Sequence, residues 1–175
     1  EAIIANGLHE KIQRMTNMNQ LYKELLSYPT IGNFLAYQYS IDINYSELTS
    51  FSEMDFVAPG PGAKDGIKKC FSDLGEFTEE DVIKYVAERQ EPEFEQRSIK
   101  FKTLWGRPLQ LIDCQNLFCE IDKYARVAYP NVTGNSGRKR IKQKFVQKSN
   151  PTIQWFPPKW GLNERIRLRM VPHVL

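Results

Sequence analysis

One stretch of the sequence decides the fold: Phe56-Val57-Ala58-Pro59-Gly60-Pro61-Gly62-Ala63-Lys64-Asp65-Gly66-Ile67-Lys68-Lys69-Cys70-Phe71. Prolines that fix φ and glycines that permit a sharp turn predict a hairpin between two short amphipathic segments, the second a helix over 63–71. We expect Ile67, Cys70 and Phe71 to face inward, with the lysines near the helix start and on its outer side. Free N–H groups at such a start attract phosphate. The alternative is a plain loop between two helices.

The sequence upstream of the hairpin is helical in pattern. Apolar residues at helical spacing predict a helix over 2–28, which Pro29 ends. A second helix is predicted over 31–43. We expect it to lie in the core because its apolar residues leave few polar positions: Phe34, Leu35, Tyr37, Tyr39 and Ile41. A short helix that begins near Ser52, as its N-cap, leads into the hairpin.

Downstream of the hairpin, helices are predicted over 81–90 and 109–129, with an irregular segment over 91–107 between them. Inward positions of the longer helix are Leu111, Phe118, Ile121 and Ala125. A Gly/Asn/Ser loop over 131–137 and a short basic helix over 138–146 follow. Because no convincing pair of strands is found, the predicted fold class is mainly α. We expect a helical domain over 1–150 and an irregular Pro/aromatic basic arm over 151–175.

The charge of the chain is uneven, although the net charge is only +3. Between Gly137 and Lys148 there are six basic residues and no acid, which suits a polyanion; the alternative is a solvated basic face. The three cysteines form no metal-ligand pattern and no disulfide framework, so we expect no metal. We find no signal peptide and no membrane-spanning run, and expect an intracellular protein, in the cytoplasm or, in a eukaryote, the nucleus. Glu1 in place of Met suggests an excised piece.

Three elements in order resemble the helix-hairpin-helix DNA glycosylases. Pro59-Gly60-Pro61-Gly62-Ala63-Lys64 looks like that family's Pro-Gly-x-Gly-x-Lys hairpin, Gln38 looks like its gap-filling Gln, and Leu111-Ile112-Asp113 looks like the element that carries its essential carboxylate. The resemblance implies a glycosylase-like helical fold. The cysteines that ligate an iron–sulfur cluster in some glycosylases are absent, so no cofactor is implied.

The sequence resembles a divergent branch more closely. The segments Phe34-Leu35-Ala36-Tyr37-Gln38-Tyr39, Asp55 to Ala63, Leu111 to Asn116 and Arg140 to Phe145 are similar to the helical domain of 5-hydroxymethyluracil DNA kinases and to related thymine-hypermodification (glutamyl/putrescinyl-thymine pyrophosphorylase) proteins. Two departures stand out: Asp65-Gly66 replaces the usual Thr-Ala after the hairpin, and the gap from Lys64 to Asp113 is much longer than in ordinary glycosylases, so that 72–107 would be an insertion. The implied partner is double-stranded DNA that carries modified pyrimidines.

The resemblance assigns candidate site residues. Asp113 would be the catalytic carboxylate, and Lys64 an amine nucleophile. Each has an alternative: Asp113 as a first-turn acid favoured by the helix dipole, and Lys64 as a phosphate contact, which we favour. A pocket for a flipped base would be lined by Gln38, Tyr37, Tyr39, Asp42, Gln115 and Asn116, although the tyrosines equally fit a core and Asp42 a cap or ion pair. The DNA phosphates would be held by Gly60, Gly62, Lys64, Lys68, Lys69, Arg138, Lys139, Arg140 and Lys142.

Three hypotheses follow. The first is an enzyme that flips a 5-substituted pyrimidine and acts on it, in the main reading as a DNA glycosylase that cleaves the N-glycosidic bond. The second is a DNA-binding domain whose separate kinase or transferase partner supplies the chemistry. The third is an RNA- or protein-binding module. A kinase reaction within this chain is not expected, because the sequence has no Gly-x-x-x-x-Gly-Lys-Ser/Thr loop.

Overall fold

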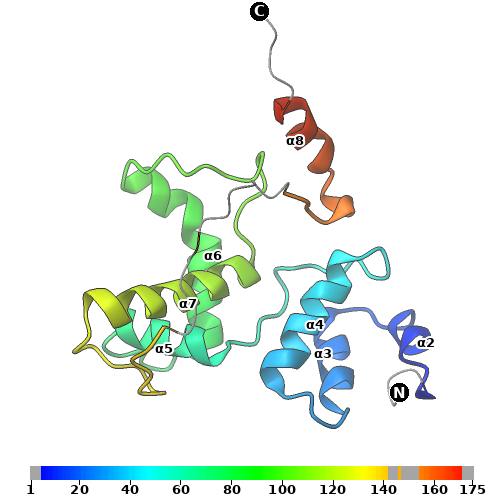
Figure 1. Ribbon diagram of the computed structural model, residues 1–175, viewed down its shortest axis with the longest axis horizontal. Coiled ribbons are helices and arrows are strands. Elements are labelled where there is room, and N and C mark those ends of the chain that lie inside the picture. The colour runs from blue at the N-terminus through cyan, green and yellow to red at the C-terminus, as the bar shows by residue number, and fades with distance from the viewer. Residues whose placement is uncertain (1–4, 142–145, 147–153, 171–175) are drawn as a thin grey trace, which may run out of the picture.

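The structure is a computed structural model that describes residues 5–141, 146 and 154–170, and these residues are mainly helical (Figure 1). In chain order the helices are α2 (Leu8–Ile12), α3 (Met18–Leu26), α4 (Asn33–Tyr45), α5 (Pro61–Cys70), α6 (Glu79–Gln96), α7 (Leu111–Ala128), the 3₁₀ helix η1 (Pro158–Trp160) and α8 (Asn163–Met170). An isolated bridge between Leu104 and Arg107 is the one β pairing within the described ranges. The mainly-α class is therefore confirmed, whereas the specific glycosylase-like arrangement stays a prediction.

Two helices replace the single helix predicted near the N-terminus. The Asn17 side chain accepts a hydrogen bond from the Gln20 amide at 3.0 Å and so begins α3 anew after α2 has ended. Leu8 and Ile12 of α2 and Leu21 and Leu25 of α3 form a small cluster with Tyr28 and with Ala36 of α4. A capping Asn inside an apolar-periodic run is the signal that divides this segment.

Helix α4 joins the small cluster to the larger core. Tyr37 and Ile41 are buried in the core that α5, α6 and α7 complete. The opposite positions are not buried: Phe34 is 50% exposed, and Leu35 and Tyr39 are also exposed. The prediction that the whole helix lies in the core is therefore wrong, because one stripe of a helix is enough to bury Tyr37 and Ile41.

The segment that enters the hairpin is not a helix. Residues 51–60 have no helical turn, and the Ser52 hydroxyl accepts a hydrogen bond from the Met54 amide within a turn. Pro61 then begins α5, with Gly60 as its N-cap. The predicted helix after the hairpin is confirmed, but the predicted short helix before it is absent. Ile67 faces the core as predicted, whereas Cys70 and Phe71, at the end of α5, are exposed.

Helices α5, α6 and α7 pack into the main core (Figure 1). Thr78 and Asp81 form a capping box at the start of α6, which runs further than predicted and carries seven acidic residues against two basic ones. The bounds of α7 lie within two residues of the prediction, and Leu111, Phe118 and Ala125 are buried as expected. The contact of α5 with α7 is the most extensive between any two of the helices.

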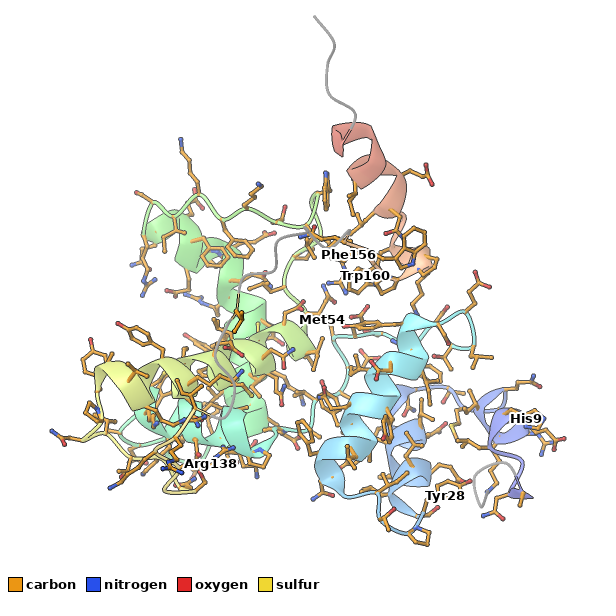
Figure 2. The ribbon with its side chains drawn as sticks, in the orientation of Figure 1. His9, Tyr28, Met54, Arg138, Phe156 and Trp160 are labelled. Carbon is orange, nitrogen blue, oxygen red and sulfur yellow. The ribbon has the colours of Figure 1, made fainter. Side chains whose placement is uncertain are left out.

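The C-terminal part of the described chain differs from the prediction. The loop over 131–137 is confirmed, but 138–141 is not helical, and the remainder of the predicted basic helix lies mostly outside the described residues. The arm contains η1 and α8, and Leu162 and Ile166 are buried. Figure 2 shows Phe156 and Trp160 together beside the end of α4, far along the molecule from Arg138.

Candidate nucleic-acid interface

The hairpin glycines serve close packing. The Gly60 amide donates a hydrogen bond to the Gln115 side-chain oxygen at 3.0 Å, and a Cβ atom on Gly60 would lie 3.0 Å from the Phe34 ring. A Cβ atom on Gly62 would lie 3.1 Å from the Cys119 sulfur. A side chain at either position would therefore press on its neighbour where α5 approaches α4 and α7. The Gly60 amide, which was expected to contact a phosphate, is bonded within the protein.

A pocket opens where the hairpin, α4 and α7 meet, with a volume of about 490 Å³. We call it the amide pocket, because three predicted base-pocket residues line it: Gln38, Gln115 and Asn116. The Gln38 side-chain nitrogen is buried and has no hydrogen-bond partner among the described residues. The pocket is also lined by the Phe34 ring and by charged side chains of α7 and the segment after it: Glu120, Asp122, Lys123, Arg126 and Arg138. A volume of this size lies within the usual range of small-molecule sites.

The three other predicted base-pocket residues lie elsewhere. Tyr37 is buried in the core, where desolvation raises the pKa of its hydroxyl above the usual range. Tyr39 and Asp42 are exposed and do not line the amide pocket. For the tyrosines the reason is the helical repeat, since Phe34 and Gln38 are four residues apart on one face of α4 while Tyr37 and Tyr39 point in other directions. Asp42 follows Gln38 on the same face but lies one turn further along α4, beyond the residues that line the pocket.

A wide basic hollow adjoins the amide pocket. Its volume is about 1320 Å³, and its cationic lining comes from the end of α7 and from the segment after the loop: Lys123, Arg126, Arg138, Lys139 and Arg140. Phe34, Glu120, Lys123, Arg126 and Arg138 line both the hollow and the pocket, so the two are continuous. Three predicted phosphate-binding residues thus meet at one site, and Lys142 lies outside the described residues.

Buried ion pairs hold the basic segment against α5 and α7. Asp122 accepts hydrogen bonds from Lys69 at 2.8 Å and from Arg126 at 2.6 Å. Arg138 donates to Asp65 at 3.1 Å and lies 3.8 Å from Asp122 (Figure 2 labels Arg138). The side chain of Lys69 is only 3% exposed. Its predicted place on the outer side of α5 is therefore wrong, because Asp122 draws it inward.

The remaining hairpin lysines are accessible. Lys64 and Lys68 are exposed and line a smaller hollow of about 270 Å³ between α5 and the start of α6. The Lys64 ammonium lies 3.9 Å from the Glu79 carboxylate, an exposed pair that contributes little to stability. Neither lysine lines the amide pocket, so a nucleophilic role for Lys64 stays a prediction.

Asp113 lies in a different environment from the one expected. Its carboxylate accepts a hydrogen bond from the Gln110 amide at 2.8 Å in a capping box that begins α7. It also lies 3.5 Å from Arg107, whose other nitrogen pairs with Glu53 at 2.7 Å. Asp113 lines neither the amide pocket nor the basic hollow. These contacts explain the residue as a helix cap, and its catalytic role stays a prediction.

Several residues of the interface were not singled out from the sequence. Phe34, Lys123 and Arg126 line both cavities, and the helical repeat could have indicated them. Phe34 is one turn before Gln38, and Lys123 is seven residues after Asn116, so each shares a helix face with a residue that was predicted. Within the described ranges no group of His, Cys, Asp and Glu is arranged to hold a metal ion. No helix there is long and apolar enough to cross a membrane.

Comparisons with known proteins give a family match and a relative. Residues 1–134 match the family model described as "5-hmdU DNA kinase, helical domain". The chain is also 28% identical over 115 residues to the 5-hmdU DNA kinase of Bacillus phage SP10. That alignment covers 62% of this chain and 18% of the phage protein, so the chain spans less than a fifth of this relative. No solved structure matches the chain.

Proposed function

This chain belongs to the family of 5-hmdU DNA kinase helical domains, and we propose that it is the DNA-binding module of a base-hypermodification system. In this role it holds DNA that carries a 5-substituted pyrimidine, while a separate polypeptide segment supplies the kinase or transferase chemistry. The observation that carries the proposal is the continuity of the basic hollow with the amide pocket.

The two cavities suit two parts of a nucleic acid. The cationic lining of the hollow would neutralise backbone phosphates, which supply most of the affinity in such complexes. The amide pocket would take a base that has left the stack, since the exposed Phe34 ring offers a stacking surface and the amides offer hydrogen bonds. Lys64 and Lys68 are proposed to continue the phosphate contacts along the hairpin side.

The binding role is favoured over the glycosylase role. The matched family is described as the helical domain of a 5-hmdU DNA kinase and the relative as a 5-hmdU DNA kinase, and neither description names a hydrolase. The carboxylate proposed for glycosidic cleavage caps α7 outside the amide pocket. The chemistry is assigned to another segment because this sequence has no phosphate-cradling loop.

Salt-dependent DNA binding tests the proposal. The probe is a labelled duplex that carries a single 5-hydroxymethyluracil, titrated by fluorescence anisotropy at several salt concentrations, with the single strand in parallel. Affinity is expected to fall steeply as salt rises, and Lys139→Ala should reduce the slope by about one. Lys23→Ala, which removes the same charge from α3, is the matched control and should leave the slope unchanged.

Two results would contradict the proposal. One is an affinity that does not change with salt, and the other is an equal effect of Lys23→Ala and Lys139→Ala. The same mixtures are then assayed for abasic sites. We expect none, and their formation would restore the glycosylase hypothesis, with Asp113→Asn as the variant that should abolish them.

A further inference from the structure

A chain of hydrogen bonds runs from the hairpin backbone into the amide pocket. The Gly60 amide donates to the Gln115 side-chain oxygen at 3.0 Å. The Gln115 side-chain nitrogen in turn donates to the Asn116 side-chain oxygen at 2.8 Å. We call these three groups the amide relay. Gln115 is only 1% exposed, so water does not compete for its hydrogen bonds.

Chemistry alone fixes the orientation of both amides in the relay. A backbone N–H can only donate, so Gln115 must present its oxygen to Gly60. The NH₂ group of Gln115 can also only donate, so Asn116 must present its oxygen to Gln115. The usual ambiguity between the oxygen and nitrogen of an amide is therefore resolved at both residues. The Asn116 oxygen already accepts one hydrogen bond, so the group of Asn116 that is wholly free for a ligand is its NH₂ group, which is a donor.

The other fixed polar groups of the amide pocket are also donors or are already paired. The Nε of Arg126 is buried and has no acceptor among the described residues, and this group can only donate. The carboxylate of Asp122 is taken by Lys69 and Arg126, and that of Glu120 is paired with Lys123. Gln38 is not held by the relay and can turn either end of its amide to a ligand. The polar groups that the protein holds in fixed orientations, Asn116 and Arg126, therefore offer donors and favour a ligand group that accepts, whereas Gln38 can serve either kind.

We propose that Asn116, oriented by Gln115 and Gly60, is a specificity-determining residue that selects a pyrimidine by the group at its position 4. A 4-oxo pyrimidine offers a carbonyl acceptor to the Asn116 NH₂ group. A 4-amino pyrimidine would place one NH₂ group against another and leave both unpaired, which lowers affinity by about tenfold or more. This inference rests on the proposed function and adds which hydrogen-bonding group the bound pyrimidine carries at position 4.

The hairpin also has a role in this recognition. Gln115→Glu keeps an acceptor for the Gly60 amide but has no N–H to donate to Asn116. The Asn116 amide is then free to turn, so the preference for a 4-oxo base should shrink toward equality while DNA binding persists. Gln115 acts through Asn116 and is a positioning residue in this scheme.

The test compares two duplexes that differ at one position, which carries either 5-hydroxymethyluracil or 5-hydroxymethylcytosine. The opposite strand has an abasic site there, so that unequal base-pair strengths do not enter the comparison. The quantity measured is the ratio of the two dissociation constants. Wild type should bind the 4-oxo base about tenfold more tightly. Asn116→Asp, which can only accept, should abolish or reverse the preference.

A matched control separates charge from recognition. Asn131→Asp introduces the same charge at an exposed loop position. It is expected to weaken binding of both duplexes equally and to leave the ratio of dissociation constants unchanged. If the role of Asn116 were purely structural, Asn116→Asp would leave that ratio unchanged as well. If wild type binds neither duplex, the proposed function itself is overturned. If wild type binds both but without preference, or if Asn116→Asp retains the preference, only the role of the relay is overturned.

Discussion

Asp65 illustrates how a single carboxylate orders the basic segment. It is buried in α5 and accepts hydrogen bonds from the Ser136 amide at 2.9 Å, from the Ser136 hydroxyl and from Arg138. Burial alone would raise the pKa of this carboxyl, but the bonds from Ser136 and the Arg138 charge outweigh it and lower the pKa below the usual Asp range. The loop also approaches so closely that a Cβ on Gly134 would lie 2.6 Å from Asp65.

Stability is therefore expected to fall at acid pH through Asp65. Because the folded-state pKa lies below the unfolded value, the unfolded chain binds the proton more readily, and the stabilisation is full above about pH 4 and is lost as pH falls through the lowered pKa. The measurement is urea unfolding at pH 7 and pH 3. Asp65→Asn should be less stable than wild type at pH 7, and the difference should narrow at pH 3. A difference that is the same at both pH values would contradict this role.

For single residues, the sequence indicated which side chains line one pocket better than it indicated which partners a charged side chain contacts. Gln38, Gln115 and Asn116 do line one pocket, because the helical repeat places them on faces that meet. Lys69 was misplaced because nothing near it in the sequence indicates a carboxylate 53 residues further along the chain. Asp113 shows the same limit, since a first-turn acid and a catalytic acid have one sequence pattern.

Among the elements, α5 and α7 depend on a close approach of their backbones. A Cβ atom on Gly66 would lie 2.0 Å from the Phe118 carbonyl oxygen, which is backbone and cannot swing aside. Gly66 therefore permits the approach that buries Ile67 and Phe118 and brings the two sides of the amide pocket together.

Gly66→Ala should destabilise the protein by about 3 kcal/mol or prevent folding, because the helices must move apart to admit the methyl group. Thermal or urea unfolding measures the change. The control is Gly32→Ala at the start of α4, where a Cβ atom would meet nothing within 4 Å and the backbone φ is −88°. Equal stability of Gly66→Ala and Gly32→Ala would show that α5 and α7 can move apart without a loss of folding stability.

Element boundaries followed local signals where such signals exist. Pro61 after Gly60 and the Thr78–Asp81 capping box stand at two helix starts, and the predicted helices began two residues later, at 63 and 81. The missing helix over 51–60 is a different case, because its side chains fit an amphipathic helix but its backbone carries the turn into α5. A short apolar pattern does not decide between those outcomes.

For the molecule as a whole, the C-terminal arm ties the start of α7 to the end of α4. Lys159 donates hydrogen bonds to the carbonyls of Asn44 and Thr49. Trp160 lies with its ring 3.9 Å from the Arg107 guanidinium and meets Tyr45 edge-on at 5.1 Å. Three segments distant in the sequence therefore meet at one tryptophan (Figure 2).

Trp160→Ala should loosen this junction. We expect a loss of about 2 kcal/mol, less than for a fully buried tryptophan because Trp160 is partly exposed. Hydrogen exchange read by mass spectrometry should show faster exchange over 49–53 and 104–109. The helix α3, remote from the arm, provides the internal control and should exchange as in wild type. Unchanged hydrogen exchange over 49–53 and 104–109 would show that the arm contacts this junction without stabilising it.

The acidic helix α6 also bears on how the molecule meets its target. Its C-terminal end lies at the top of Figure 1, away from the loop over 131–137 that leads into the basic hollow. One body with a negative helix and a positive cavity has an electric dipole moment, which experiences a torque in the field of a polyanion. In the proposed DNA-binding role, this torque would bias diffusional encounters in orientation, with the hollow turned toward the nucleic acid and α6 facing outward.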